Sequence, residues 1–125
     1  MAAPGRPPRE LIYALGVEPR IIPDPGDAGA IPNNQSGYVN LVTAGAETRT
    51  LADPVFVGQV LTLIFVEDNG NCVVTASSAV NQTGNNTLTF TDVGEVITLL
   101  GAYNATDGWE WKDLDTVQGC ALTTV

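Results

Sequence analysis

Few residues of this chain have side chains that usually catalyse reactions or hold metal ions. The chain contains two cysteines, Cys72 and Cys120, a single lysine, Lys112, and no histidine. A Ser, Thr or Cys nucleophile needs a base to take its proton, usually histidine, so the common nucleophile–base pairs cannot be written. Cys-x-x-Cys pairs and Cys/His clusters are missing, which argues against a structural zinc site. We therefore expect a protein that is not an enzyme, with no cofactor and no metal.

Acidic residues are more numerous, but they occur where the chain is expected to turn. Glu67 and Asp68 precede the dipeptide Asn69-Gly70, and further carboxylates flank Trp111. Two carboxylates can act as a general acid and base, yet carboxylates in turns are usually solvated. The spacing of a calcium loop is not present around Asp68. A type I′ hairpin turn explains Asn69-Gly70 without a metal.

Two tryptophans, Trp109 and Trp111, share one face of a predicted strand because side chains alternate with a period of two. Exposed aromatic rings on a β domain can stack on sugars, so a glycan-binding surface is one interpretation. The chain has only eight aromatic residues, and the alternative that we favour places both rings in the core or between subunits. We predict that Trp109 and Trp111 lie at an oligomer interface.

Composition and charge restrict the class of protein. Of the 125 residues, 44% are hydrophobic and only 15% are charged, and the formal net charge is −9. Nucleic acid is a poor partner, since phosphate binding needs clustered Lys and Arg. The longest apolar run, near residues 60–66, is too short to span a bilayer. The first ten residues lack the apolar core of a secretion signal, so we expect synthesis in a cytoplasm, with both cysteines as buried free thiols rather than a disulfide.

A repeated heptapeptide organises the second half of the chain. Residues 57–63 (VGQVLTL) and 93–99 (VGEVITL) are identical at five of seven positions. Similarity of this kind indicates repeated supersecondary structure. We expect Gly58 and Gly94 to occupy a bend or bulge that only glycine accommodates, and the two copies to supply the two halves of the domain.

The body of the protein is predicted to consist of about eight short strands separated by turns. The pattern indicates an all-β fold, a small antiparallel β-sandwich or barrel formed by residues 37–125. Asn69-Gly70 is expected to be a hairpin turn, and Asp107-Gly108 a second one. The predicted strands are residues 38–43, 48–51, 57–66 (long and central in its sheet), 72–76, 87–91, 95–103, 109–112 and 119–124.

The first 36 residues differ from the body in composition. Seven of the eight prolines lie before residue 33, and proline removes a backbone donor that a central strand or helix would need. Apolar side chains between the prolines make the segment too apolar for a purely solvated linker. We expect an extended proline-rich N-terminal arm, residues 1–36, that lies on a neighbouring molecule. Its expected contact residues are Arg6, Arg9, Leu11, Ile12, Tyr13, Leu15, Arg20, Ile21 and Ile22.

This combination of an apolar arm and an acidic all-β body with Val-Gly-x-Val-x-Thr-Leu repeats resembles the capsid decoration (cement) proteins of tailed bacteriophages. Residues 94–100 (GEVITLL) and 107–111 (DGWEW) carry the resemblance, which covers residues 37–113 in style and the arm in character. It implies a structural virion protein, made in the host cytoplasm, that binds the outside of the phage head. Its implied partners are the major capsid protein and further copies of itself, commonly in a trimer, with no nucleic acid or membrane.

An alternative from a different class is a receptor- or glycan-binding module of a phage tail fibre or tip. In that case Trp109, Trp111 and the acidic loops would form the ligand face. Binding to a glycan would then change the tryptophan fluorescence, which a decoration protein does not require.

Overall fold

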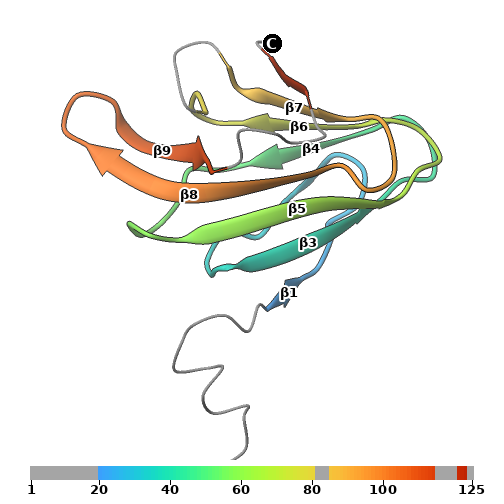
Figure 1. The fold of residues 1–125 in the computed structure, drawn as a ribbon, viewed down its shortest axis with the longest axis horizontal. Helices are drawn as coiled ribbons and strands as arrows, with labels where there is room; N and C mark the ends of the chain where they lie inside the picture. The colour runs from blue at the N-terminus through green and yellow to red at the C-terminus, as the bar shows by residue number, and fades with distance from the viewer. Residues whose placement is uncertain (1–19, 81–84, 115–120, 124–125) are drawn as a thin grey trace, which may run out of the picture.

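The computed structural model describes residues 20–80, 85–114 and 121–123, and their fold is all β (Figure 1). Ten strands form two mixed sheets: sheet A has the order β1-β3-β5-β8-β9, and sheet B the order β10-β7-β6-β4-β2. The described residues include no helix, and therefore none long and apolar enough to cross a membrane. The strands are β1 (Ile21–Ile22), β2 (Gly29–Ala30), β3 (Gly37–Val42), β4 (Glu47–Leu51), β5 (Val60–Glu67), β6 (Cys72–Ala76), β7 (Thr87–Phe90), β8 (Val96–Asn104), β9 (Gly108–Asp113) and β10 (Ala121–Thr123).

In its first half the chain crosses from one sheet to the other at every connection. β1, β3 and β5 belong to sheet A, whereas β2, β4 and β6 belong to sheet B. After two crossings a strand runs in its original direction, so β1–β3–β5 and β2–β4–β6 pair in parallel. The other pairs, β5–β8, β8–β9, β6–β7 and β7–β10, are antiparallel. The expected all-β fold is confirmed, but the expectation of antiparallel pairing is wrong for the first half, and the sheets are open layers rather than a closed barrel.

The turn at Asn69-Gly70 differs from the expected hairpin, because it connects β5 in sheet A to β6 in sheet B. A type I′ turn needs positive φ at both central residues, and Ala28 is the only non-glycine residue of the described part with positive φ. The Asn69 side chain instead donates to the carbonyl of Thr43, at 2.8 Å. Gly70 lies so close to the β3–β4 turn that a Cβ would come within 2.2 Å of the Gly45 backbone.

The two heptapeptide copies lie side by side in sheet A rather than in two halves of the domain. β5 and β8 pair antiparallel with Thr62 opposite Thr98, so a local two-fold relation maps one copy onto the other. Each copy begins with a turn in which glycine has positive φ, +89° at Gly58 and +96° at Gly94. The expectation for the two glycines is confirmed, whereas the expectation that the copies form separate halves is wrong.

The residue after each of these glycines closes its own turn in the same way. The side chain of Gln59 accepts a hydrogen bond from the backbone N–H of Val55, at 2.8 Å. Glu95 accepts one from the backbone N–H of Thr91, at 2.7 Å. The sequence repeat is therefore a repeat of turn geometry as well as of strand pattern.

The core lies between the two sheets, whose layers are visible in Figure 1. Inward-facing residues alternate with outward-facing ones, as in β5, where Leu61, Leu63 and Phe65 are fully buried. The Phe65 ring contacts the edge of Phe90 from sheet B, with centroids 6.2 Å apart. The predicted central position of the long strand β5 is confirmed. Cys72 is a buried free thiol, as expected, whereas Cys120 lies outside the described residues.

Residues 20–36 belong to the body, which corrects the expected boundary after residue 36. β1 and β2 pair with β3 and β4. Ile22 and Ile31 are buried in the core, with 1% and 2% of their surface exposed. These short strands escape prediction because two residues with prolines nearby carry no period-two pattern. Residues 1–19 of the expected arm lie outside the described residues.

Candidate functional site

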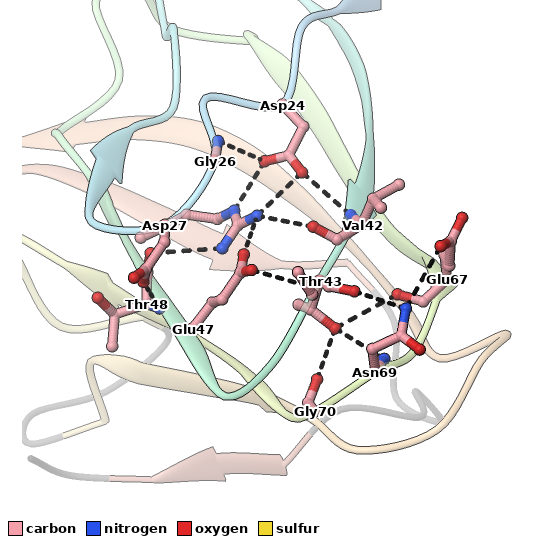
Figure 2. Close-up of polar contacts among 12 residues, drawn as sticks. Asp24, Gly26, Asp27, Val42, Thr43, Glu47, Thr48, Glu67, Asn69 and Gly70 are labelled. Atoms are coloured by element: carbon pink, nitrogen blue, oxygen red, sulfur yellow. Dashed lines mark hydrogen bonds and ion pairs between the residues drawn. The ribbon is translucent and has the colours of Figure 1, made fainter.

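A buried ion pair fastens the N-terminal part of the chain to the body (Figure 2). Arg49 occupies an inward-facing position of β4, between the inward-facing Glu47 and Leu51, and its side chain is fully buried. Its Nε and Nη2 atoms donate to the two carboxylate oxygens of Asp24, at 2.7 and 3.0 Å. Bidentate pairing of this kind matches the fork of the guanidinium group to a carboxylate.

The guanidinium of Arg49 has further acceptors. Nη2 also contacts the carboxylate of Glu47 at 2.9 Å and donates to the carbonyl of Val42 at 3.0 Å, and Nη1 donates to the carbonyl of Thr48 at 3.4 Å. A buried guanidinium is stable only when its charge and its N–H groups have partners. The hydrogen bonds that Arg49 donates to Asp24 raise the pKa of Arg49, although burial acts in the opposite direction. The arginine therefore stays charged.

Asp24 is held in its ionised form by the same contacts. Burial alone would raise the pKa of Asp24, but the hydrogen bonds from Arg49 and from the backbone N–H groups of Val42 and Gly26 outweigh it. The two backbone bonds measure 3.0 and 3.3 Å. The net result is a pKa for Asp24 below its ordinary value.

Asp24 lies in the loop between β1 and β2, so the ion pair joins this loop to β4 and to the end of β3. The neighbouring Asp27 accepts a hydrogen bond from the backbone N–H of Thr48, at 3.0 Å. On either side of this loop, Ile22 and Ile31 insert into the core. We name this set, Ile22, Asp24, Asp27, Ile31 and Arg49, the N-terminal anchor.

The contacts of the N-terminal anchor attach the β1–β2 loop to the body of the protein. The anchor's arginine stays charged, and both oxygens of Asp24 are occupied by donors. The nearby Cys72 is no better as a nucleophile, because burial raises the pKa of its thiol to about 11 and the thiolate is the reactive form. Within the described ranges, no group of three or more His, Cys, Asp or Glu residues is placed to hold a metal ion.

The predicted contact residues of the arm are distributed over described and undescribed parts of the chain. Arg20 and Ile21 are described and exposed, Ile21 with 66% of its surface. Ile22, in contrast, points into the core, so the prediction that it contacts a neighbour is wrong: its side chain is unavailable while the protein is folded. The other predicted residues lie outside the described residues: Arg6, Arg9, Leu11, Ile12, Tyr13 and Leu15.

The Asp24–Arg49 pair was not expected from the sequence, although the sequence contains a signal for it. In Glu47–Leu51 (ETRTL) the period of two that buries Leu51 also points Arg49 inward. A charged residue at such a position needs a buried partner. The sequence could not tell which of the fourteen acidic residues supplies it, because that depends on how the β1–β2 loop folds.

The two tryptophans of β9 do face the same side, but they have different environments. Trp111 is a core residue with 1% of its surface exposed, and its indole N–H donates to the carbonyl of Ala52 at 2.9 Å. Its predicted place at an oligomer interface is therefore wrong, since the chain's own residues cover it. Trp109 is half-buried and packs against Tyr103 of β8, with ring centroids 5.1 Å apart and ring planes at 57°.

Tyr103 was not singled out from the sequence, yet more than half of its surface is exposed. It lies beside the hairpin tip, where Asn104 accepts hydrogen bonds from the backbone N–H groups of Thr106 and Asp107, at 2.9 and 2.7 Å. The hairpin predicted at Asp107-Gly108 is confirmed. The structure thus presents the pair Tyr103–Trp109 on a well-ordered tip.

These features define an all-β module with a buried N-terminal anchor at one end and an aromatic pair on the β8–β9 hairpin. Comparison with protein-family models and with curated proteins finds no match to this chain.

Proposed function

We propose that this protein is a structural virion protein that decorates the outer surface of a phage head and stabilises the head by bridging capsid subunits. The observation that supports this proposal is the N-terminal anchor. A segment that bridges two subunits carries tension, so its attachment to the body must resist being pulled out. The anchor fixes the chain to the body just after residues 1–19, the part of the expected arm that precedes it.

The mechanical argument follows from the contacts along the chain. A pull on the residues before Arg20 acts first on the pairing of Ile21 and Ile22 with β3. It must then expose the buried Ile22 and separate Asp24 from Arg49. Breaking a buried ion pair by removing one partner costs about 3–5 kcal/mol. The anchor would therefore hold while weaker contacts of the arm with the capsid give way.

The arm is tested by a truncation whose boundary the structure supplies. Deleting residues 1–32 would remove Ile22, Asp24 and Ile31 from the fold, so the truncation must stop before residue 20. The chain that begins at Arg20 keeps every contact described above. We expect it to remain folded and to lose most of its binding to phage heads stripped of decoration protein, in a co-sedimentation assay with the full chain as reference. Full occupancy by the truncated chain would contradict the arm.

The receptor- or glycan-binding module is a second candidate, which the pair of the exposed Tyr103 and the half-buried Trp109 favours. Two aromatic rings at 57° to each other present faces on which a sugar ring can stack. A glycan panel read by tryptophan fluorescence tests it, because Trp109 reports on its own surroundings. Binding that is lost in Tyr103→Ala would support this candidate, and an unchanged spectrum with every glycan would eliminate it.

A further inference from the structure

The two sheets have outer faces of very different character. On sheet B, the outward-facing residues of β4, β6 and β7 are almost all threonine: Thr48, Thr50, Val73, Thr75, Thr87 and Thr89. On sheet A, the corresponding positions include more aliphatic and aromatic residues, with the polar Asn40, Thr62 and Thr98 among them: Ile21, Tyr38, Val60, Ile64, Val96 and Leu100. Threonine suits a sheet face in contact with water, whereas the sheet A residues do not.

The register shows that the sheet A residues form one continuous surface. Ile64 lies opposite Val96, and Val60 lies opposite Leu100, on neighbouring strands. Tyr38 continues the surface onto β3, and Ile21 continues it onto β1. We name this surface the outer face of sheet A. Contiguous apolar surface of this kind marks an interaction site in soluble proteins.

Two pairs of polar side chains on the outer face of sheet A satisfy one another. The hydroxyls of Thr62 and Thr98 lie 3.2 Å apart and share a hydrogen bond. At the β9 side, Lys112 forms an ion pair with Glu110 at 2.6 Å. These paired groups can be covered at little desolvation cost, since they keep their partners, whereas the amide of Asn40, opposite Ile64, would need a partner in the second copy.

We propose that the outer face of sheet A is covered by a second copy of this chain. Each copy has a formal net charge of −9, so copies repel one another wherever their carboxylates meet. The central outward-facing positions of β3, β5 and β8 carry no carboxylate. Glu110 lies on the side strand β9, where Lys112 compensates its charge, and the exposed Glu67 lies at the end of β5, opposite Val42. Two copies can therefore approach through the centre of this face without opposing carboxylates.

A basic protein or a nucleic acid fits this face less well than a second copy does. Such partners are recognised through exposed carboxylates or through lysine and arginine clusters, and this face presents neither. Aliphatic side chains on a sheet pack well on a similar sheet about 10 Å away. The interior of this protein uses the same kind of packing between its own two sheets.

The dimensions of the face are sufficient for a specific contact. Strands about 4.8 Å apart and residues about 3.3 Å apart along each strand give a surface of roughly 20 by 25 Å. Two such faces together bury on the order of 1,000 Å², which is the lower range for specific interfaces. The contact we infer is thus of modest size, so its strength will depend on concentration.

This inference does not depend on a role in phage heads, and it explains a feature of the sequence. β5 contains the almost continuous apolar run Val60–Val66, with apolar residues at positions of both parities. A run of that type is expected for a strand that is buried on both faces. In one copy of the chain only the inner face of β5 is buried, and a second copy would bury the outer one.

The test is the mass of the full chain in solution, measured by light scattering over a range of concentrations. We expect a multiple of 13.1 kDa for the wild type. The variant Ile64→Lys should weaken self-association at least tenfold, because it places a charge in the centre of the face. Val73→Lys is the matched control: Val73 is also half-buried, β-branched and outward-facing, but on sheet B, and the change in net charge is the same.

A second variant protects the test against misfolding. Val66→Lys alters a residue of β5 with 41% of its surface exposed, so the folded monomer tolerates it, and circular dichroism will verify the fold of all three variants. Dissociation by Ile64→Lys and Val66→Lys but not by Val73→Lys would support the inference. A wild type that is monomeric at every concentration, or an oligomer that resists both sheet A variants, would overturn it. Neither outcome depends on head binding by the arm.

Discussion

Replacing Asp24 by asparagine removes the charge that Arg49 needs while changing the shape of the side chain very little. The guanidinium of Arg49 is fully buried and cannot turn to water. An asparagine amide keeps one oxygen acceptor, but in either orientation its NH₂ group would face the guanidinium and one backbone N–H group, of Gly26 or of Val42, all of which are donors. The variant therefore combines a lost ion pair with opposed donors.

The size of the stability loss in Asp24→Asn depends on the groups that remain around Arg49. Removing one partner of a buried ion pair destabilises proteins by about 3–5 kcal/mol. Glu47 stays within 2.9 Å of the guanidinium and offsets part of the charge, so we expect a loss near the lower end, about 3 kcal/mol. For a domain of this size that loss lowers the melting temperature by about 10–15 °C.

The assay is thermal and urea unfolding of the full chain, followed by circular dichroism. Asp27→Asn is the control, since it removes the same charge from the same loop. Asp27 is exposed and accepts one hydrogen bond, from Thr48, which asparagine can also accept. We expect this control to lose less than about 1 kcal/mol. If Asp24→Asn loses no more than Asp27→Asn does, the ion pair does not fasten the N-terminal segment and the reasoning is refuted.

Three further predictions concern pH, backbone geometry and thiol reactivity. Because the pKa of Asp24 is lowered in the folded protein, its ionisation contributes stability above the unfolded carboxyl pKa of about 3.9. This stability is lost as the pH falls through the lower folded pKa, so the difference in unfolding free energy between wild type and Asp24→Asn should shrink below about pH 4. A constant difference down to pH 2 would contradict this prediction. Gly94→Ala should lower the unfolding free energy by about 1–2 kcal/mol, because φ is +96° at Gly94 although there is space for a Cβ. Gly45→Ala is the control, since space is also open there but φ is ordinary, and it should change the unfolding free energy little. Equal losses for the two variants in urea titrations would disprove the role of the positive φ. In a Cys120→Ser background, Cys72 should resist a thiol reagent at pH 8 until urea unfolds the protein, since burial raises the pKa of its thiol to about 11. Rapid labelling of the folded chain would show that the thiol is accessible and would contradict this prediction.

Local patterns in the sequence determined the strands, because each depends on neighbouring residues alone. The period of two in residues 87–91, the long strand expected at residues 95–103 and the Asp107-Gly108 turn predicted elements that the structure contains as β7, β8 and the β8–β9 hairpin. The glycines of the two repeats were expected at bends, and Gly58 and Gly94 have the positive φ that such turns require. In these strands and turns, the conformational preferences of a few neighbouring residues decide the local structure.

The pairing of the strands was decided by the tertiary structure. Asn69-Gly70 favours a hairpin locally, yet β5 and β6 lie in different sheets because both bury an apolar face in the same core. Contact with the Gly45 backbone and the hydrogen bonds to Thr43 fix this turn in its observed form. Local preference of about 1 kcal/mol is easily outweighed by the burial of several aliphatic side chains.

In the N-terminal anchor, too, the local sequence decides some features and the tertiary structure decides others. The sequence by itself carries the alternation that points Arg49 inward in β4, and the prolines that keep the described strands β1 and β2 at two residues each. Only the tertiary structure decided that Asp24 is the partner of Arg49, that Ile22 belongs to the core and that Trp111 does too. The physical reason is that a buried charge or a large ring requires particular neighbours, and those neighbours come from segments far apart in the chain, which only the packing of the two sheets brings together.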